Sequence, residues 1–190
     1  MSIIHTHDIT LAGTSGRHVL TLKPLTDGHL PLLYRWCADA EVMKWADEGG
    51  AIFDEEEVRV LYGRASRAGH CFLIEADGVP AGECWLQRMD ASFVRSMYPA
   101  GVDVRRIDIC IGEKAYWGRG IGTAAVKLLI KFAFEREQTD VIHCLCAEDN
   151  AASCRLWEKC GFSLIDRERM LQCKRKTYRR HYRLRRWEYG

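Results

Sequence analysis

The fold of this chain is decided by a glycine-rich stretch, Trp117-Gly118-Arg119-Gly120-Ile121-Gly122-Thr123. This stretch lies between an alternating, strand-like segment, Arg105 to Ile111, and a long amphipathic segment, Thr123 to Glu137. Its three glycines remove side chains where the strand turns into a helix, so the N–H groups of the first helical turn are free to point at an anion. Because the helix dipole also favours negative charge there, the stretch predicts a pyrophosphate-binding loop.

Other glycine-rich motifs fit this stretch less well. A P-loop needs Lys followed by Ser or Thr after its last glycine, whereas Gly122 is followed by Thr123-Ala124-Ala125. A dinucleotide-binding loop needs G-x-G-x-x-G early in a βαβ unit, and the glycine spacing here is different. Taken alone, the three glycines also fit an ordinary helix N-terminus that binds no ligand.

The residues that follow favour a ligand-binding loop. Val141 to Ala147 is a continuous apolar run of strand length. It is followed by a segment in which Asn150 is a suitable N-cap and Gly161 a suitable residue after the helix end. A short helix with both ends marked is therefore expected after this strand.

This order of motifs resembles the GNAT N-acetyltransferase superfamily, whose members use acetyl-CoA. In that family a Q/R-x-x-G-x-G/A loop binds the CoA pyrophosphate, and an N-x-x-A/S…Y-x-x-x-G-F helix flanks the pantetheine. The resemblance covers residues 17–187 and is sharpest from Arg105 to Phe162. It implies an α/β fold: a mixed, mostly antiparallel twisted sheet with helices on both faces, whose central parallel strands splay apart to admit acetyl-CoA.

The resemblance also implies which residues bind acetyl-CoA. They are backbone oxyanion donors of the central strand, the glycine loop and the capped helix, namely Ile109, Cys110, Ile111, Trp117, Gly118, Arg119, Gly120, Ile121, Gly122, Thr123, Asn150, Ser153 and Trp157. Two positions depart from the family pattern: Trp117 stands in place of Gln or Arg, and Trp157 in place of Tyr. Because an indole N–H has no useful acidity, Trp157 is not able to protonate a departing thiolate.

Asp108 is the candidate catalytic residue. It lies between Ile107 and Ile109 in the expected central strand, where an unpaired buried charge would be costly. A carboxylate at this position could accept the proton of an attacking amine or bind that amine. The alternative is a structural ion pair with Arg106, which lies two residues earlier on the same face of the strand. Glu113 is a second, more exposed candidate.

Within the superfamily, the chain is most similar to the aminoglycoside 6′-N-acetyltransferases. The matching pieces are Tyr34-Arg35-Trp36, Val42-Met43-Lys44-Trp45, Val104-Arg105-Arg106-Ile107-Asp108 and Trp157-Glu158-Lys159-Cys160-Gly161-Phe162. This resemblance implies acetylation of the 6′-amine of an aminoglycoside, an antibiotic-resistance activity, with Asp108 beside the acceptor amine. The expected substrate-binding residues are Trp45, Asp47, Glu48, Tyr98, Asp108 and Glu148.

Charge is unevenly distributed, although the formal net charge is only +2. Between Asp39 and Glu57 there are eight acidic residues and one basic residue, whereas Arg167 to Arg186 holds ten basic residues and one acidic residue. The acidic region fits the mouth of a cleft for a polycation, or merely a solvated surface. The basic region keeps two alternatives open: an N-terminal acetyltransferase of proteins or ribosomal proteins, and a non-catalytic module that binds nucleic acid.

Length and composition set further bounds. The 190 residues fit one N-acetyltransferase domain, 1–190, and 47% of them are hydrophobic. We expect no membrane segment because no apolar run approaches the roughly 20 residues that span a bilayer, and residues 1–15 have no signal-peptide pattern. The nine cysteines show no C-x-x-C spacing, which predicts reduced thiols, a cytoplasmic location and no metal. We expect a small-molecule amine as partner, no nucleic acid, and a monomer or homodimer.

The remaining elements follow from hydrophobic period and turn residues. Strands are expected at residues 19–22, 70–76, 80–87, 162–170 and 178–187, with a hairpin turn at Asp77-Gly78. Helices are expected from Thr26 or Asp27 to Cys37 and from Asp54 onwards, and residues 42–51 as loop or helical turn. Residues 90–103 are irregular and contain aromatic side chains, which favours a lid or substrate loop.

Overall fold

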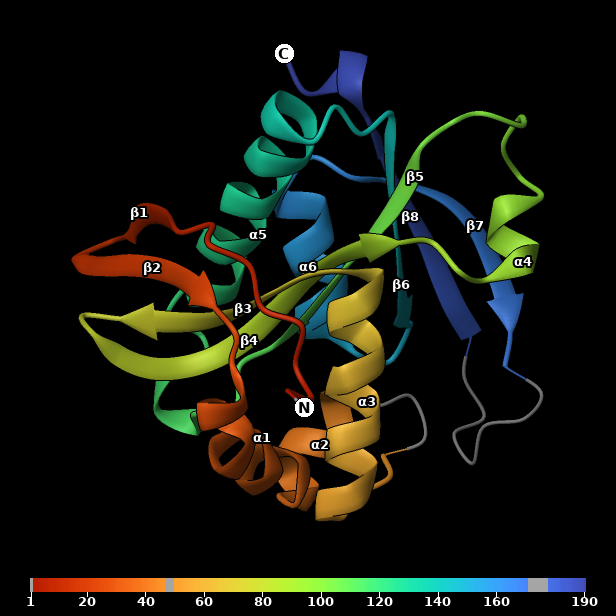
Figure 1. Ribbon diagram of the computed structural model, residues 1–190. Helices are drawn as coiled ribbons and strands as arrows, with labels where there is room; N and C mark the ends of the chain where they lie inside the picture. Colours follow the sequence, from red (N-terminus) through yellow and green to blue (C-terminus); the bar gives the residue numbers. More distant parts are fainter. Residues whose placement is uncertain (1, 47–49, 171–177) are drawn as a thin grey trace.

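One mixed sheet forms the centre of the molecule (Figure 1). The computed structural model describes residues 2–46, 50–170 and 178–190, and over these ranges the strand order is β1-β2-β3-β4-β5-β6-β8-β7. The strands are β1 (Leu11–Ser15), β2 (His18–Pro24), β3 (Gly69–Ala76), β4 (Val79–Arg88), β5 (Val104–Cys110), β6 (Val141–Ala147), β7 (Ser163–Arg169) and β8 (Tyr178–Arg185). Only β5 and β6 are parallel neighbours in this part of the chain, so the expected mostly antiparallel sheet is confirmed.

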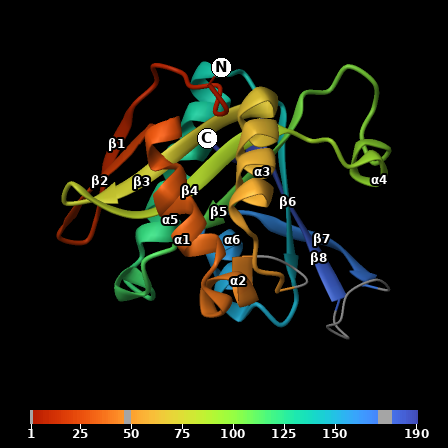
Figure 2. The same ribbon diagram turned by 60° about the horizontal axis from the view of Figure 1, so that its bottom comes forward.

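Helices cover both faces of the sheet (Figures 1 and 2). They are α1 (Leu30–Cys37), α2 (Ala40–Ala46), α3 (Glu55–Ala68), α4 (Ser92–Arg95), α5 (Ile121–Lys131) and α6 (Ala151–Lys159). Short helical turns are η1 (Asp27–His29), η2 (Lys114–Tyr116) and η4 (Arg186–Glu188), and a π-helical turn, η3 (Phe132–Arg136), extends α5. In the described ranges no helix is long and apolar enough to cross a bilayer.

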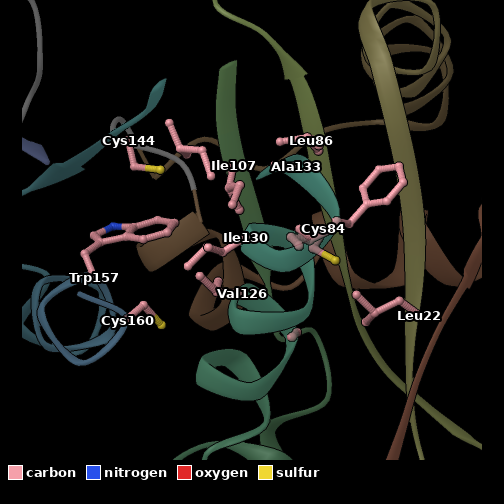
Figure 3. Packing of buried hydrophobic residues seen from close by; sticks show 14 of the residues in the cluster. Leu22, Cys84, Leu86, Ile107, Val126, Ile130, Ala133, Cys144, Trp157 and Cys160 are labelled. Atoms are coloured by element: carbon pink, nitrogen blue, oxygen red, sulfur yellow. The ribbon is translucent and has the colours of Figure 1, made fainter. Parts of the chain in front are cut away.

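The larger apolar core lies between the sheet and α5. Side chains alternate along a strand, so Leu22, Leu86 and Ile107 point from three strands towards the same face. There they pack with Val126 and Ile130 of α5 (Figure 3). Burying side chains of this size stabilises the fold by about 1.5–3 kcal/mol each. This packing fixes α5 against the sheet and therefore fixes the glycine loop that precedes it.

The opposite face carries a second core beneath α1 and α3. Trp36 of α1 and Tyr62 of α3 are buried there with Leu73 of β3 and Trp85 of β4. Helix α3 begins as predicted, because the Asp54 side chain accepts a hydrogen bond from the amide of Glu57. Each core therefore packs one layer of helices against one face of the central strands.

The parallel strands β5 and β6 separate after a short pairing. Their register joins Val104 to Val141 and Arg105 to Ile142. Beyond these pairs, β5 continues beside β4 as far as Cys110, and β6 continues beside β8 as far as Ala147. The expected opening between the central parallel strands therefore lies at their C-terminal ends, next to the glycine loop.

Several element boundaries differ from expectation. Helix α5 begins at Ile121 rather than Thr123, because Gly120 already serves as its N-cap. Residues 40–46 form a complete helix, α2, where a loop or one turn was expected. Strand β1 has no counterpart among the expected strands. It is an edge strand with small residues, and its position depends on pairing with β2, which local sequence does not reveal.

Candidate active site

The glycine loop presents the N-terminal amides of α5 towards open space. Gly120 has φ +79° and ψ −1°, a left-handed conformation that favours glycine, and Gly118 has φ +72°. The first amide bonded back into the helix is that of Ala124, which donates to the Gly120 carbonyl at 3.0 Å. The amides of Ile121, Gly122 and Thr123 precede that bond, and no side chain of the N-cap accepts from them. Such a helix start attracts anions.

A channel of about 560 Å³ begins at these amides. It runs between the glycine loop, the end of β5, helix α2 and the start of α6. Most predicted cofactor-binding residues line it, namely Ile109, Cys110, Ile111, Trp117, Gly118, Gly120, Ile121, Gly122, Thr123, Asn150 and Ser153, together with the predicted substrate residue Trp45. The structure therefore gathers residues that are up to 108 positions apart in the sequence around one space.

Asn150 joins two walls of this channel. Its side-chain oxygen accepts a hydrogen bond from the amide of Ser153 at 3.1 Å, which caps α6. Its side-chain nitrogen donates to the backbone carbonyl of Trp45 at 3.1 Å. One residue therefore starts α6 and holds the end of α2 against it. The predicted cap is confirmed.

The end of β5 offers backbone donors to the opening between the strands. The Met89 amide donates to the Val104 carbonyl, so Val104 and the alternate residues Arg106 and Asp108 turn their backbone groups towards β4. The N–H groups of Ile107 and Ile109 therefore point away from β4, towards β6. The Trp117 indole donates to the Ile111 carbonyl at 2.7 Å, which ties the glycine loop to this strand.

Asp108 lies at the centre of a hydrogen-bonded network. One of its oxygens, Oδ2, accepts from Arg106 Nε at 2.7 Å and from Gln87 Nε2 at 2.7 Å. The other, Oδ1, accepts from Arg106 Nη2 at 3.0 Å. Although burial opposes it, the contact with Asp108 raises the pKa of the Arg106 guanidinium. The Asp108 side chain remains 33% exposed, so the carboxylate is both ion-paired, as the structural alternative anticipated, and accessible.

A second carboxyl group, Glu83, is buried on the same face of the sheet. It is 5% exposed and lies opposite Cys110 in the β4–β5 register, next to the pair formed by Trp85 and Asp108. Its Oε2 atom has no hydrogen-bond partner. Burial, reinforced by the negative charge of Asp108, raises the pKa of Glu83 well above its ordinary value. Glu83 is a part of this region that the sequence analysis did not single out.

Other predicted residues lie outside the channel lining. Trp157 is 3% exposed and packs against Phe162, with ring centroids 5.3 Å apart, inside the larger core (Figure 3). Arg119 contributes its backbone carbonyl, which accepts from the Ser15 hydroxyl at 3.2 Å. Tyr98 lies beyond α4 and contacts His143. Asp47 and Glu48 fall outside the described residues.

Glu148 is engaged by two arginines. Arg167 Nη2 lies 2.5 Å and Arg180 Nη2 2.9 Å from its carboxylate. Hydrogen bonds from Arg167 and then from Arg180 lower the pKa of Glu148. The second candidate base, Glu113, is likewise engaged by Arg35 and by the Trp36 indole at 2.8 Å. Of these three carboxylates, only Asp108 lies within the central strand β5, as the sequence analysis expected.

The acidic and basic regions of the sequence are largely paired within the described chain. Lys114 Nζ lies 2.9 Å from Asp39 and 2.8 Å from Glu41, while Asp54 and Glu57 cap α3. The arginines of β8 and η4 are engaged in the same way, by Glu148, Glu168, Glu188 and Asp140. The turn Lys174-Arg175-Lys176 lies outside the described residues. Much of the charge segregation therefore serves local structure.

A second groove, of about 650 Å³, continues from the first along α5. It shares Gly120, Thr123 and Lys159 with the channel, and it adds Lys127 and Lys131, which lie one helical turn apart. Sequence reasoning missed these lysines, although their four-residue spacing after a glycine loop was visible. It also missed channel residues on α2, η2 and α6, namely Val42, Ala46, Tyr116, Ala151, Ala152, Arg155, Leu156 and Lys159.

The described cysteines are free thiols, and all but Cys110 are buried. Cys110 lines the channel, and burial raises its pKa well above the ordinary value. Within the described ranges, no group of three or more His, Cys, Asp or Glu side chains has an arrangement that would hold a metal ion.

Comparison with known proteins agrees with this geometry. The profile of the acetyltransferase (GNAT) domain matches residues 19–163, and the chain therefore belongs to the GNAT acetyltransferase family. An aminoglycoside N(6′)-acetyltransferase type 1 from Klebsiella pneumoniae is 23% identical over 156 residues, covering 78% of this chain and 76% of that protein.

Solved structures share the fold. Aminoglycoside acetyltransferase AAC(6′)-Ib in complex with coenzyme A and kanamycin has a TM-score of 0.75 and 19% identity, covering 90% of this chain and 96% of that one. A ribosomal L7/L12 α-N-protein acetyltransferase, RimL, in complex with coenzyme A has a TM-score of 0.72 and 14% identity, covering 94% and 99%. The same fold therefore serves proteins with different acceptors.

Proposed function

We propose that this protein is an acetyl-CoA-dependent N-acetyltransferase that acetylates a primary amine of a polycationic small molecule, with the 6′-amine of an aminoglycoside as the favoured acceptor. The observation that carries the proposal is the union of three features around one channel. Free amides lead α5, and β5 and β6 separate beside them. Asp108 lies on the separating strand, where its neighbour Ile109 lines the channel although Asp108 itself does not. The whole site would belong to one N-acetyltransferase domain, residues 1–190.

The residues present fit the CoA part of acetyl-CoA. The α5 amides and Gly118 would hold the diphosphate, because a helix start attracts anions and the space beside Gly118 is open. A Cβ atom at Gly122 would lie 3.1 Å from Leu156 Cδ1, so glycine also allows α6 to close on the loop. The three lysines of the adjoining groove supply positive charge for the remaining phosphate of CoA.

The chain supplies the polar groups that acetyl transfer needs. Acetyl-CoA brings the acetyl group as an activated thioester. The Ile109 and Ile111 amides would donate to the carbonyl oxygen as negative charge develops there, and fixed donors of this kind are usually the largest contribution to catalysis. Asp108 would accept the proton of the acceptor amine, directly or through water. Trp157, which has no ionisable proton and is buried in the core, takes no part in proton transfer.

Two observations support a small cationic acceptor. Trp45 lines the channel on α2, where an aromatic ring can meet an ammonium group or a sugar face. The 23% identity to an aminoglycoside N(6′)-acetyltransferase extends over most of both chains. These observations favour an aminoglycoside-like amine over other acceptors, with antibiotic resistance in the cytoplasm as the corresponding role.

Acetylation of a ribosomal-protein N-terminus is the second candidate. It rests on the basic region and on the fold shared with RimL. Arg179, Arg180 and Arg186 are nevertheless ion-paired within the protein. Their charge is therefore less available to ribosomal RNA than the sequence suggested, and this candidate is placed second.

A panel of acceptors tests the proposal. Acetyl-CoA consumption is followed by release of free thiol with kanamycin, tobramycin, a ribosomal-protein N-terminal peptide and no acceptor. We expect turnover with an aminoglycoside. Turnover with the peptide alone would replace the proposed acceptor by the second candidate. Salt-sensitive RNA binding without thiol release from any amine would instead indicate a non-catalytic nucleic-acid-binding module.

A further inference from the structure

Two buried histidines and the half-buried Tyr98, from distant segments, form a hydrogen-bonded chain away from the cofactor channel. The Tyr98 hydroxyl lies 2.7 Å from His143 Nδ1, and His143 Nε2 lies 3.1 Å from His181 Nδ1. His143 is 0% exposed and His181 2%. The far ring nitrogen of His181, Nε2, lies 3.5 Å from the Glu168 carboxylate but has no hydrogen-bond partner, so the hydrogen-bonded chain ends at His181.

His143 has a hydrogen-bond partner at each ring nitrogen, Tyr98 at Nδ1 and His181 at Nε2. A neutral imidazole donates at one nitrogen and accepts at the other, and a tyrosine hydroxyl can match either role. Because the His143 ring is fully buried, leaving either nitrogen without a partner would cost free energy. The Tyr98 hydroxyl is therefore a required part of this environment.

This chain anchors the segment 90–103. Phe93 contacts the His181 ring, with centroids 5.9 Å apart, and also lies beneath the Arg179 guanidinium. Val94 is fully buried with Val104 of β5 and Val141 of β6. Through Tyr98, the His143 ring fixes the later half of the segment as well.

The anchored segment belongs to the same sheet face as Asp108. Val104, Arg106 and Asp108 alternate along β5 and so point the same way. The first residue of the segment, Asp90, lies 3.5 Å from the Arg106 guanidinium, which in turn donates two hydrogen bonds to Asp108. In Figures 1 and 2, α4 stands apart from α3, with β6 running between them. The segment therefore stands beside the carboxylate that would meet the acceptor.

We propose that His143 is a positioning residue for the acceptor: through Tyr98, it holds the segment 90–103 as the wall of the acceptor site beside Asp108. This inference rests on the proposed function in one respect, which is that an amine reaches Asp108. His143 touches neither the reacting atoms nor the cofactor channel. Its effect is on the position of the wall and so on the affinity for the acceptor.

Three variants separate the two hydrogen bonds of His143. Tyr98→Phe removes only the hydroxyl. His143→Asn places its side-chain amide near the position of Nδ1 and keeps a hydrogen-bond partner for Tyr98. His143→Gln reaches the position of Nε2, so it keeps the bond to His181 and loses the one to Tyr98. Tyr178→Phe is the matched control, because it removes a tyrosine hydroxyl at the start of β8. The Tyr178 ring packs against Arg167 and points to the face opposite Arg179, the residue that contacts Phe93.

The measurements are steady-state kinetics with kanamycin and amide hydrogen exchange of residues 92–102. We expect Tyr98→Phe and His143→Gln to raise the KM for kanamycin by about 3- to 10-fold, the effect of losing one hydrogen bond. The KM for acetyl-CoA stays unchanged, and exchange in residues 92–102 becomes faster. His143→Asn stays close to wild type in both the KM for kanamycin and the exchange of residues 92–102. The double variant Tyr98→Phe/His143→Gln raises the KM no more than either single variant.

Other results would overturn the inference. One is a folded Tyr98→Phe protein with wild-type exchange in residues 92–102. Another is an equal rise of both KM values, which marks a general loss of structure. If kanamycin is not a substrate, the exchange measurement still decides, because it needs no acceptor. Failure of the proposed function and failure of the positioning role are therefore distinguishable.

Discussion

Replacing Asp108 by Asn separates its catalytic role from its structural one. An asparagine keeps the size of the side chain, but only its single oxygen can accept, so at least one of the three hydrogen bonds from Arg106 and Gln87 is lost. Hydrogen bonds to charged groups contribute about 1.5–3 kcal/mol each when buried. Because this side chain is one-third exposed, solvent screening reduces the loss of stability to about 1–2 kcal/mol.

The catalytic loss is expected to be larger. General-base catalysis contributes about 10²- to 10⁴-fold, which corresponds to about 3–5 kcal/mol in the activation barrier. We expect Asp108→Asn to fold, with a modestly lower melting temperature, and to lose at least about 100-fold in kcat/KM for the acceptor. The assay is thiol release from acetyl-CoA at saturating and limiting amine, with circular dichroism to confirm folding.

Arg106→Gln is the matched control. It breaks the same ion pair from the other side but leaves the carboxylate in place. We expect it to cost similar stability and to keep kcat/KM within about 10-fold of wild type, since the base is retained. The reasoning is refuted if Asp108→Asn retains more than about one-tenth of wild-type kcat/KM, or if both variants lose activity equally. Either result would leave Asp108 with the structural role alone.

Other predictions concern the loop, the core and two buried titratable groups. Gly120→Ala puts a Cβ atom on a left-handed residue, at about 1–2 kcal/mol of strain, and should weaken CoA binding about 5- to 30-fold in calorimetry. Gly78 has the same φ of +79° in a turn with open space around it, so Gly78→Ala should leave the affinity for CoA unchanged. Equal effects of the two substitutions would contradict diphosphate binding by the glycine loop. Trp157→Phe should keep kcat within about threefold of wild type, because the indole supplies no proton. A much larger loss would indicate that Trp157 takes part in proton transfer. Burial, aided by the neighbouring His181 and Arg183, lowers the pKa of His143 from 6.5 to about 4. The unfolded chain therefore binds the extra proton between these pH values, and about 3 kcal/mol of stability should be lost as pH falls through that window. The free energy of unfolding of His143→Asn, measured with urea, should depend less steeply on pH in that window than the wild-type value. Equal pH dependence of the two proteins would exclude His143 as the titrating group. Because folding raises the pKa of Glu83, its contribution has the opposite sign: stability should fall as pH rises above about 4.5, the ordinary pKa. Glu83→Gln should lose that dependence in the same experiment.

The parts of the fold that local sequence determines were predictable. The glycine triplet, the Asn150 cap and the Asp54 cap each depend on a few adjacent residues, and each of the three marks a helix start in the structure. The first residue of α5 was misplaced by two positions. Glycine in the left-handed conformation can itself serve as the N-cap, and the sequence does not distinguish Gly120 from Gly122 in that role.

The contacts that define the site were less predictable, because they join distant segments. Arg167 and Arg180 meet Glu148 across 19 and 32 positions, so a carboxylate expected to bind substrate is engaged within the protein. Tyr98 meets His143 across 45 positions. Such pairs depend on strand register, which is set by the sheet as a whole. The contact between Asp108 and Arg106 is the exception. The two residues lie on the same face of one strand, and the sequence analysis named their ion pair as an alternative.

The central claim is that the amides at the start of α5 hold the diphosphate of CoA. The direct measurement is a titration of isotope-labelled protein with CoA, following the backbone amide resonances by two-dimensional NMR. The account predicts saturable shifts that are largest at Gly118, Gly120, Ile121, Gly122 and Thr123, and that are reduced in Gly120→Ala. Saturating CoA that leaves these five resonances in place would contradict it.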